Sequence, residues 1–290
     1  MDTIFLDRGA AAAMLPARSS EGAKWDFGRL LAICGSESMP GAAVLACSAA
    51  ARSGAGLVRL AAVPQAAGVV AAHLAECTYL PLLCEDGHIS ARSLPVLLGE
   101  AESYPALLFG PGLGRSEDTG ELLRALITQY RGTLIIDADG LNALCGCTDA
   151  LTRAAGEIIL TPHVFEMARL SGRDAEDIRR DPGGSAAVFA ETHGVTAVLK
   201  GSVTHIAGGG ALYANDRPNS GLAKGGSGDV LAGLIAGLAA QGAEPLHAAA
   251  AGVFVHSLAG ALAAESLGRR GMLPSDTAAM IPHALRELEK

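Results

Sequence analysis

The sequence predicts one α/β domain with three layers, in which helices cover both faces of a mostly parallel central sheet. Short, continuously apolar segments alternate with Ala- and Leu-rich stretches along most of the 290 residues. Strands that are apolar throughout are typical of sheets buried on both faces, and alternation with helices implies parallel pairing through right-handed crossovers. A closed eight-fold barrel is disfavoured because too few strand–helix units precede the helical C-terminal part.

Six apolar segments are the predicted parallel strands, and a hairpin follows them along the chain. The hairpin pairs residues 204–207 with residues 211–215 through three consecutive glycines, a composition that favours a tight turn. The parallel strands are expected at residues 30–34, 57–62, 106–109, 134–137, 157–160 and 196–200.

The predicted helices lie between and after these strands. Ser116 is the expected N-cap of one helix, which has two acidic residues in its first turn, an arrangement that stabilises a helix start. Gly233 and Gly237 indicate close packing of a later helix against a neighbour. Residues 1–28 are expected to form an arm or an extra helix of the single domain 1–290. The other helices are expected at residues 42–53, 66–75, 185–193, 229–240, 246–267 and 277–289.

The composition argues against several classes of function. A net charge of −8 and an aromatic content of 4%, without a basic patch, argue against nucleic-acid binding. The six cysteines include no C-x-x-C pair, which favours reduced thiols over a metal site or disulfides. The longest apolar run, residues 230–240, is too short to span a bilayer. Acidic residues near the N-terminus argue against a secretory signal, so we expect a cytoplasmic protein that binds no membrane.

The segment NSGLAKGGSGD, residues 219–229, gives the strongest indication of a ligand. Glycines let the backbone approach a ligand closely, and the helix that follows offers unpaired N–H groups at the positive end of its dipole. Asp229, in the first turn of that helix, is a candidate general base, and as an alternative it caps the helix. The spacing matches neither Walker A nor G-x-G-x-x-G. The predicted anion hole consists of Gly225, Gly226, Ser227 and Gly228.

Three further segments follow predicted strands, at the edge of the sheet where ligands gather in open α/β folds. GPGLG at residues 110–114 and GSESMPGAA at residues 35–43 have small side chains that leave room for a ligand. The alternatives are a simple strand-to-helix turn and close helix packing, respectively. KGSVT at residues 200–204 places Lys200 where it can meet a phosphate, or forms a plain hairpin turn.

Three polar residues near strand ends have two interpretations each. Asp137 and Asp139 suit a metal or a phosphate-linked water, or an ordinary turn. His163 follows an apolar strand, so it either contacts a ligand or caps a helix whose first turn holds Glu166. His256, by contrast, lies inside an apolar helical stretch, where we expect a core histidine with its hydrogen bonds satisfied.

Taken together, these segments resemble those of the ADP-dependent NAD(P)H-hydrate dehydratase family, a branch of the ribokinase-like superfamily. GGSGD alone indicates only the superfamily, whereas its combination with MPGAA, GPGLG and TPH is specific to the family. The resemblance extends from about Gly28 to the C-terminus. It rests on GSESMPGAA, RSGAGLV, FGPGLG, IIDADGLN, ILTPH, VLKGSVT, NSGLAKGGSGDVLAGLIAGL and GVFVHSLAG.

The resemblance implies a ribokinase-like fold and a hydro-lyase that repairs damaged nicotinamide nucleotides. The S epimer of hydrated NADH or NADPH would lose water, while ADP, or ATP in its place, supplies the driving force; ADP becomes AMP and phosphate. A magnesium ion is expected beside the nucleotide, without a dedicated metal cage on the protein. By the resemblance, Ala42, Gly112, His163 and Asp229 contact the hydrate, and Lys200, Gly201, Ser202, Val203, Thr204 and Gly228 line the AMP portion.

A mechanism follows from the residue types. Asp229 would take the proton of the hydroxyl on the damaged ring, and that oxygen would attack the terminal phosphate of ADP. The phosphorylated oxygen then leaves more readily than hydroxide. Many relatives carry a fused epimerase domain, which this chain is expected to lack, so a separate epimerase is the expected functional partner. A homotetramer is expected by resemblance alone.

Two positions depart from the family pattern. Val164 and Phe165 follow the TPH motif where relatives have a small residue and a glycine, which leaves the role of Glu166 open. Lys224 precedes the double glycine where threonine is frequent. An additional lysine is compatible with a nearby phosphate.

Two other functions stay open beside the dehydratase. A ribokinase-like kinase of a small vitamin-precursor alcohol would use the same anion hole and Asp229, but with ATP and a stable phosphorylated product. A non-enzymatic sensor would bind the nucleotide without turnover. The MPGAA and GPGLG segments favour the dehydratase over the kinase, and Asp229 argues against the sensor.

Overall fold

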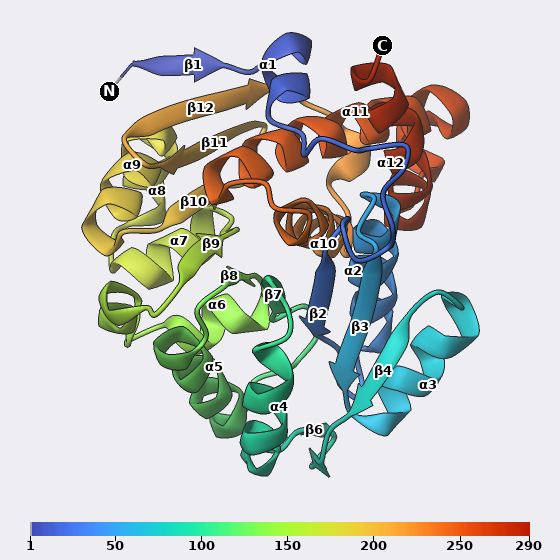
Figure 1. Ribbon diagram of the computed structural model, residues 1–290. Coiled ribbons are helices and arrows are strands. Elements are labelled where there is room, and N and C mark those ends of the chain that lie inside the picture. The colour runs from blue at the N-terminus through green and yellow to red at the C-terminus, as the bar shows by residue number, and fades with distance from the viewer. Residues whose placement is uncertain (1) are drawn as a thin grey trace.

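A ten-stranded sheet forms the centre of the computed structural model, which describes residues 2–290 (Figure 1). The strand order is β1-β12-β11-β10-β9-β8-β7-β2-β3-β4. Only β11 is antiparallel to its neighbours among these ten strands, so the mostly parallel sheet is confirmed. The strands are β1 Thr3–Phe5, β2 Arg29–Ile33, β3 Leu57–Ala62, β4 Thr78–Pro81, β7 Ala106–Phe109, β8 Thr133–Ile136, β9 Glu157–Leu160, β10 Thr196–Leu199, β11 Val203–Gly208 and β12 Ala211–Asp216, with β5 Cys84–Glu85 and β6 His88–Ile89 forming a separate hairpin.

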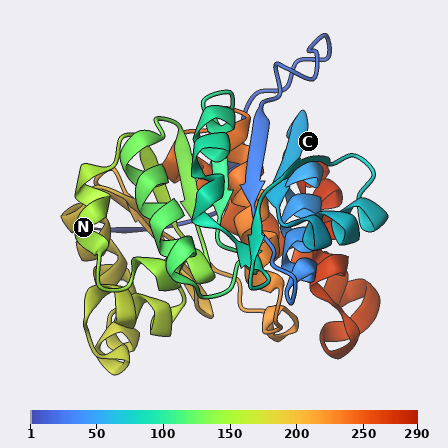
Figure 2. The same cartoon turned by 90° about the horizontal axis from the view of Figure 1, so that it is seen from below.

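Helices cover both faces of the sheet, which confirms the three layers (Figures 1 and 2). Helices α2, α3, α10, α11 and α12 pack together on one face, and helices from the middle of the chain, α4 to α9, lie on the other. The helices are α1 Arg8–Ala13, α2 Pro40–Arg52, α3 Pro64–His73, α4 Leu94–Ala101, α5 Glu117–Gln129, α6 Asp139–Leu144, α7 Val164–Ser171, α8 Ala175–Arg180, α9 Pro182–His193, α10 Ser227–Ala240, α11 Pro245–Gly271 and α12 Pro274–Leu288.

The predicted helices exist, but most of them begin earlier than expected. Helices α2, α3, α9, α11 and α12 each have proline in the first turn. Proline at the first helical position lacks only an N–H that would have no partner there, and its fixed φ suits a helix. A proline before an apolar stretch is therefore the better start signal than the first apolar residue.

The N-terminal residues contain both a strand and a helix rather than a free arm. β1 adds a parallel strand beside β12 at one edge of the sheet, and α1 packs against α11 and α12. β4, the β5–β6 hairpin, α4 and α8 are also absent from the sequence-based expectations. The segments of β4, the hairpin and α8 are short and partly exposed, so they carry little of the apolar pattern on which those expectations depend. Helix α4 is apolar, but its eight residues are too few to show a helical period.

Helix α11 is long and apolar enough to cross a membrane by its composition. However, 72% of its most apolar window is buried inside the fold, as in the central helix of a globular domain. Gly268 has a non-helical backbone near its C-terminal end, so the regular helix is shorter than its full span.

Helices α2 and α10 are in direct backbone contact. A side-chain carbon at Gly233 would collide with the backbone of Ala46, and one at Gly237 would collide with Ser53 and with the backbone of Ala50. The two glycines therefore allow the close packing that the sequence predicts, and they fix the position of the start of α10 against α2.

Four central strands end at the same level of the sheet. The register aligns Ile33 with Phe109, Phe109 with Ile136, and Ile136 with Leu160. Beyond them, a parallel bridge joins His163 to Lys200. The segments singled out in the sequence therefore meet along one edge, the carboxyl edge of the parallel strands.

Candidate functional site

A cavity of about 760 Å³ opens at the carboxyl edge of the sheet. It lies between the loop that precedes α10, the ends of β8 to β10 and one side of α11. Ten of the predicted site residues line it, although they come from three separate segments: His163, Lys200, Gly201, Ser202, Thr204, Gly225, Gly226, Ser227, Gly228 and Asp229.

Several backbone N–H groups in and just before the first turn of α10 have no protein partner, although the N–H of Ser227 donates to the carbonyl oxygen of Lys224 at 3.2 Å. Gly226 is the N-cap residue, with φ +98°, and has no side chain that could accept a hydrogen bond. Among the described residues, no acceptor pairs with the backbone N–H groups of Gly225, Gly226, Gly228 or Asp229. These groups stand at the positive end of the helix dipole, so the geometry is that of an anion site.

Three buried side-chain atoms around the cavity also lack partners within the described residues. They are Ser227 Oγ, His256 Nε2 and Asn215 Oδ1, and all three residues line the cavity. Unpaired buried polar atoms are costly, so a polar ligand that pairs with them would be stabilised. His256 is buried as expected, but the prediction of a satisfied histidine is wrong.

Asp229 faces the cavity from the third residue of α10. Its carboxylate takes part in none of the hydrogen bonds found in the described chain, so it does not cap the helix. Burial, reinforced by the negative charges of Asp137 and Asp139 against the opposing charge of Lys200, raises the pKa of Asp229 from 3.8 to about 7. A carboxylate with a pKa near neutrality suits a general base.

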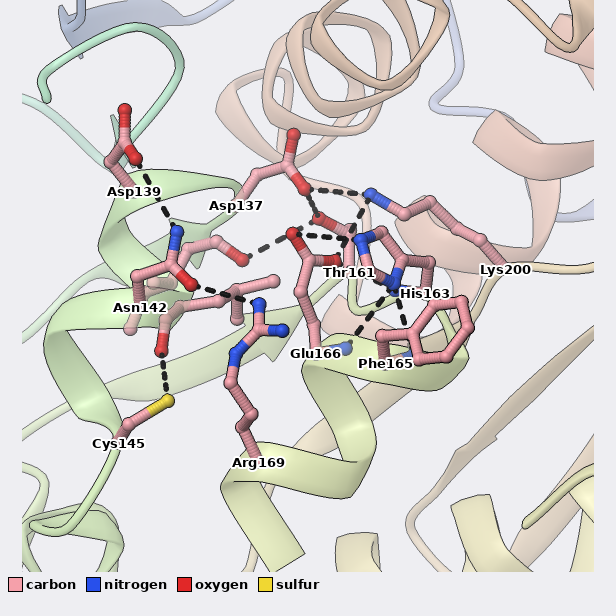
Figure 3. A network of polar contacts seen from close by, with 12 residues as sticks. Asp137, Asp139, Asn142, Cys145, Thr161, His163, Phe165, Glu166, Arg169 and Lys200 are labelled. Atoms are coloured by element: carbon pink, nitrogen blue, oxygen red, sulfur yellow. Dashed lines mark hydrogen bonds and ion pairs between the residues drawn. The ribbon is translucent and has the colours of Figure 1, made fainter. Parts of the chain in front are cut away.

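Asp137 and Lys200 form a buried ion pair beside this carboxylate (Figure 3). Lys200 Nζ lies 2.9 Å from Asp137 Oδ1, which also accepts a hydrogen bond of 2.7 Å from Thr161 Oγ1. Burial alone would lower the pKa of Lys200, but the carboxylates of Asp137 and Glu166 outweigh it and raise that pKa. Lys200 is therefore a fixed positive charge at the cavity, next to Gly228.

His163 caps α7 and faces the cavity at the same time. Its Nδ1 accepts hydrogen bonds from the N–H groups of Phe165 and Glu166, at 3.1 and 3.2 Å, while Glu166 Oε2 accepts one of 2.8 Å from the His163 N–H. This is a capping box. Burial lowers the pKa of His163, and the nearby Lys200 and Arg169 act in the same direction against Glu166. The neutral ring, with Nδ1 as acceptor, keeps its proton on Nε2.

Three of the predicted contacts do not line the cavity. Ala42 and Gly112 lie against each other, since a side-chain carbon at Gly112 would stand 2.7 Å from Ala42 Cβ. Both residues lie at the carboxyl edge of the sheet but outside the cavity, between the start of α2 and the end of β7. Val203 also lies outside the lining residues, at the start of β11.

Comparison with known proteins places this arrangement in a family. Residues 30–283 match the family described as NAD(P)H-hydrate dehydratase. The chain belongs to this family. It is 35% identical to an ADP-dependent (S)-NAD(P)H-hydrate dehydratase from Xanthomonas campestris, over 97% of the chain and 96% of that protein. It is 41% identical to a bifunctional NAD(P)H-hydrate repair enzyme from Moorella thermoacetica, over 96% of the chain but only about half of that enzyme, 53%.

Solved structures confirm the ribokinase-like fold of this dehydratase family member. A ribokinase-like superfamily protein from Enterococcus faecalis has a TM-score of 0.86 at 26% identity, covering 99% of this chain and 96% of that one. An ADP/ATP-dependent NAD(P)H-hydrate dehydratase from Bacillus subtilis, co-crystallised with ATP and Mg²⁺, has a TM-score of 0.84 at 28% identity over 99% of both chains. The expected family and fold are thus confirmed.

The two departures from the family pattern now have structural explanations. Phe165 is 54% exposed and stacks edge-on against His163, with Arg179 over its ring, so it leaves the capping box intact. Lys224 Nζ donates to the backbone carbonyls of Arg270, at 2.8 Å, and Met272, at 2.5 Å. The ammonium of Lys224 therefore anchors the glycine loop to the end of α11.

The structure shows what Asp137 pairs with, which the sequence did not predict. It also shows two site residues that the sequence did not indicate, Asn215 and His256. The DADGLN segment predicts a polar site for Asp137 but not its pairing with Lys200, 63 residues away. Asn215 lies in β12 and His256 in α11. Each is a polar residue inside an apolar segment, and this is the one sequence signal that could have indicated them. That signal does not show which cavity such a residue faces.

No cluster of three or more His, Cys, Asp or Glu side chains that could hold a metal occurs among residues 2–290. The acidic residues at the site do not converge on one point: Asp137 is held by Lys200 and Thr161, and Asp139 by Gly114 and Asn142. These residues do not form a metal site of their own.

Proposed function

We propose that this chain catalyses ADP-dependent dehydration of the S epimer of NAD(P)H hydrate, with release of NAD(P)H, AMP and phosphate. The observation that carries the proposal is the pairing of an uncapped start of α10 with Asp229, whose pKa is raised to about 7, in one cavity. An anion site and a general base in reach of each other are the two parts that phosphoryl transfer to a hydroxyl requires.

The adenine nucleotide would enter between the β10–β11 connection and the glycine loop. The segment from Lys200 to Thr204, together with Gly228, would hold the AMP portion, and the free N–H groups of Gly225, Gly226 and Gly228 would hold the terminal phosphate. The fixed ammonium of Lys200 offsets phosphate charge there. The unpaired Ser227 Oγ and His256 Nε2 add two polar partners to the same wall.

The chemical steps balance around Asp229. Its carboxylate takes the hydroxyl proton of the hydrated ring as the oxygen attacks the terminal phosphorus of ADP, and the bond to AMP breaks. The ring carbon–oxygen bond then breaks with assistance from the ring nitrogen's lone pair, and phosphate leaves. The neighbouring ring carbon then passes a proton to the departing phosphate, which restores the double bond of the reduced nicotinamide.

The proposed function also involves contacts to the hydrate, a magnesium ion and a partner enzyme. Ala42, Gly112 and His163 would contact the hydrate from the side of α2, β7 and α7. Magnesium would accompany the nucleotide phosphates rather than be held by the protein. We also propose a cytoplasmic homotetramer that works with a separate epimerase.

The decisive experiment follows the absorbance of NADPH after adding the protein to its hydrate, with and without ADP. Recovery of absorbance only with ADP, together with release of AMP and phosphate, is the expected result. A stable phosphorylated alcohol made from ATP, without recovery of NADPH, would instead identify a vitamin-precursor kinase. Nucleotide binding without any turnover would identify a sensor.

A further inference from the structure

A second hollow, of about 550 Å³, lies beside the candidate site at the same edge of the sheet. It runs between the start of α5, helix α6 and one side of α7, and we call it the arginine groove. Two arginines line it, Arg115 just before the N-cap of α5 and Arg169 on α7. Neither forms an ion pair with a carboxylate among the described residues, in a protein whose net charge is −8.

Hydrogen bonds fix the acidic side of the groove. Asp139 Oδ2 accepts from the Gly114 N–H at 2.8 Å, and Asp139 Oδ1 accepts from Asn142 Nδ2 at 3.3 Å. Asn142 Oδ1 in turn accepts from Arg169 Nη2 at 2.9 Å, as Figure 3 shows. The carboxylate is thus satisfied locally, and one edge of the Arg169 guanidinium is held in place while its other N–H groups stay free for a ligand.

The groove and the cavity share their supporting segments. Ala138 has φ +49°, a conformation that is strained for a residue other than glycine, and it stands between Asp137, which lines the cavity, and Asp139, which lines the groove. Gly112, a proposed hydrate contact, is two residues from Gly114 of the groove. Helix α7 carries a cavity residue at its start and Arg169 two turns later.

We infer that the arginine groove binds a phosphate of the hydrated dinucleotide, in the half of the molecule that is remote from the damaged ring. This inference rests on the proposed function. The cavity has to accommodate the adenine nucleotide and the damaged ring together, so the second nucleotide of the hydrate needs a site outside it. Free guanidinium groups suit phosphate because their planar donors can bind two oxygens at once. The phosphate is either the pyrophosphate link or the 2′-phosphate that only NADPH hydrate carries.

The test measures KM for both hydrates, with ADP saturating, in Arg115→Ala, Arg169→Ala and the double variant. We expect KM for the hydrate to rise by about three- to tenfold in each single variant and more in the double one, because charge-assisted hydrogen bonds are lost. The KM for ADP and the thermal stability should stay near the wild-type values. An equal rise for both hydrates identifies the pyrophosphate, and a rise confined to NADPH hydrate identifies the 2′-phosphate.

Two matched variants sharpen the result. Arg131→Ala removes an exposed arginine just before β8, at the opposite edge of the sheet, and should leave both KM values unchanged. Glu117→Gln removes a carboxylate of the groove that has no hydrogen-bond partner among residues 2–290, so it should lower KM for the hydrate or leave it unchanged.

The failure of this inference can be told from failure of the proposed function. Wild-type turnover with KM unchanged within twofold in the double variant would overturn the groove assignment alone. A wild-type chain that turns over neither hydrate would overturn the proposed function. In that case calorimetric titration with NADPH hydrate compares the same variants without turnover, and equal affinities would overturn the groove as well.

Discussion

Helices α7 and α10 both begin at the cavity, and their first turns are built in opposite ways. In α7, the side chains of His163 and Glu166 pair with backbone N–H groups in a capping box. In α10, the N-cap is Gly226 and no side chain caps the turn. A side-chain cap contributes roughly 0.5–2 kcal/mol to stability, so α10 lacks a stabilisation that α7 has.

The difference shows that one helix start contributes to stability, whereas the other is left available for a ligand. The capped start of α7 fixes the position of His163 without any ligand. The uncapped start of α10 keeps the N–H groups of Gly228 and Asp229 free, and an anion can satisfy them in place of a side chain. Where a helix starts at a ligand site, a missing cap is therefore a functional feature, and each prediction below changes one of the two starts or its ligand.

The largest effect is expected from Asp229→Asn, which keeps the shape of the α10 start and removes the base. Turnover should fall by ~10²–10⁴-fold. Stability should move the other way: because the pKa of Asp229 is raised from 3.8 to about 7 in the fold, this carboxylate costs stability progressively as pH rises between these two values. The full cost is present at pH 8, where the variant should gain ~1–3 kcal/mol. Asp149→Asn, at an exposed ion pair on the surface, is the control for both. Turnover within threefold of wild type would rule out the role of Asp229.

The pH profile of the wild-type enzyme tests the same carboxylate without a mutation. The base must be ionised, so kcat/KM should rise with pH to a midpoint of about 7 and fall about tenfold per unit below it. Asp137→Asn removes a negative charge that raises the pKa of Asp229 and should move the midpoint to lower pH. A midpoint that stays below pH 5 in the wild type would contradict the proposed environment of Asp229.

ADP should act as the missing cap of α10. A ligand that binds only the folded state stabilises it by about 2.7 kcal/mol at ~100 times its dissociation constant. Thermal unfolding followed with increasing ADP should therefore show a rising Tm. Calorimetry that detects no ADP at millimolar concentration, with and without magnesium, would remove the basis for both the dehydratase and the kinase.

Gly226→Ala should damage the geometry of the α10 start. The residue has φ +98°, and the added carbon would stand 2.6 Å from Leu45 Cδ1. We expect a loss of about 1–3 kcal/mol of stability from the strained backbone, together with weaker ADP binding. Gly225→Ala is the matched control for stability, since no atom lies within 4 Å of its added carbon. Equal stability of the two variants would argue that the Gly226 conformation carries no strain.

The smallest effects are expected at α7, where two functions of His163 have to be separated. His163→Ala should lower stability by ~1 kcal/mol through loss of the cap and raise KM for the hydrate, with ADP affinity unchanged. Glu166→Gln weakens the cap but keeps the imidazole. It should therefore lower stability with little change in KM.

A matched variant far from the cavity completes this comparison. Asp276 caps α12 as Glu166 caps α7, by accepting a hydrogen bond of 2.7 Å from the N–H of Leu273. Asp276→Asn should cost similar stability without any kinetic effect. If His163→Ala loses stability but retains wild-type KM, His163 is a cap only and its predicted contact with the hydrate is wrong.

Much of the fold could be predicted because its strands are apolar throughout. The predicted bounds agree with the structure for β3, β7 and β9, which are buried on both faces for most of their length. The edge strand β1 could not be found in the same way, since all three of its residues are exposed. Its position depends on pairing with β12, more than 200 residues later.

The candidate site also contains features that the local sequence predicts and features that depend on distant contacts. The glycine loop and Asp229 are local features, because a run of glycines and one acid at a predicted helix start are visible in the sequence itself. That Asp229 does not cap this helix is shown only by the structure. The ion pair between Asp137 and Lys200 is not local, and neither is the meeting of His256 and Ser227 at one cavity. These contacts depend on which strands are neighbours and on where α11 crosses them, so only the three-dimensional structure shows them.

The backbone contact between α2 and α10 has a mechanical consequence. Ala42 belongs to the first turn of α2 and Gly228 to the first turn of α10, and Gly233 brings the backbone of α10 directly against that of Ala46 in α2. Reaction between two bound molecules needs their atoms within about 3–3.5 Å of each other, and an error of 1 Å lowers the rate strongly. Under the proposed function, this contact sets the distance between Ala42, the proposed hydrate contact, and Gly228, the proposed nucleotide contact, before either molecule binds.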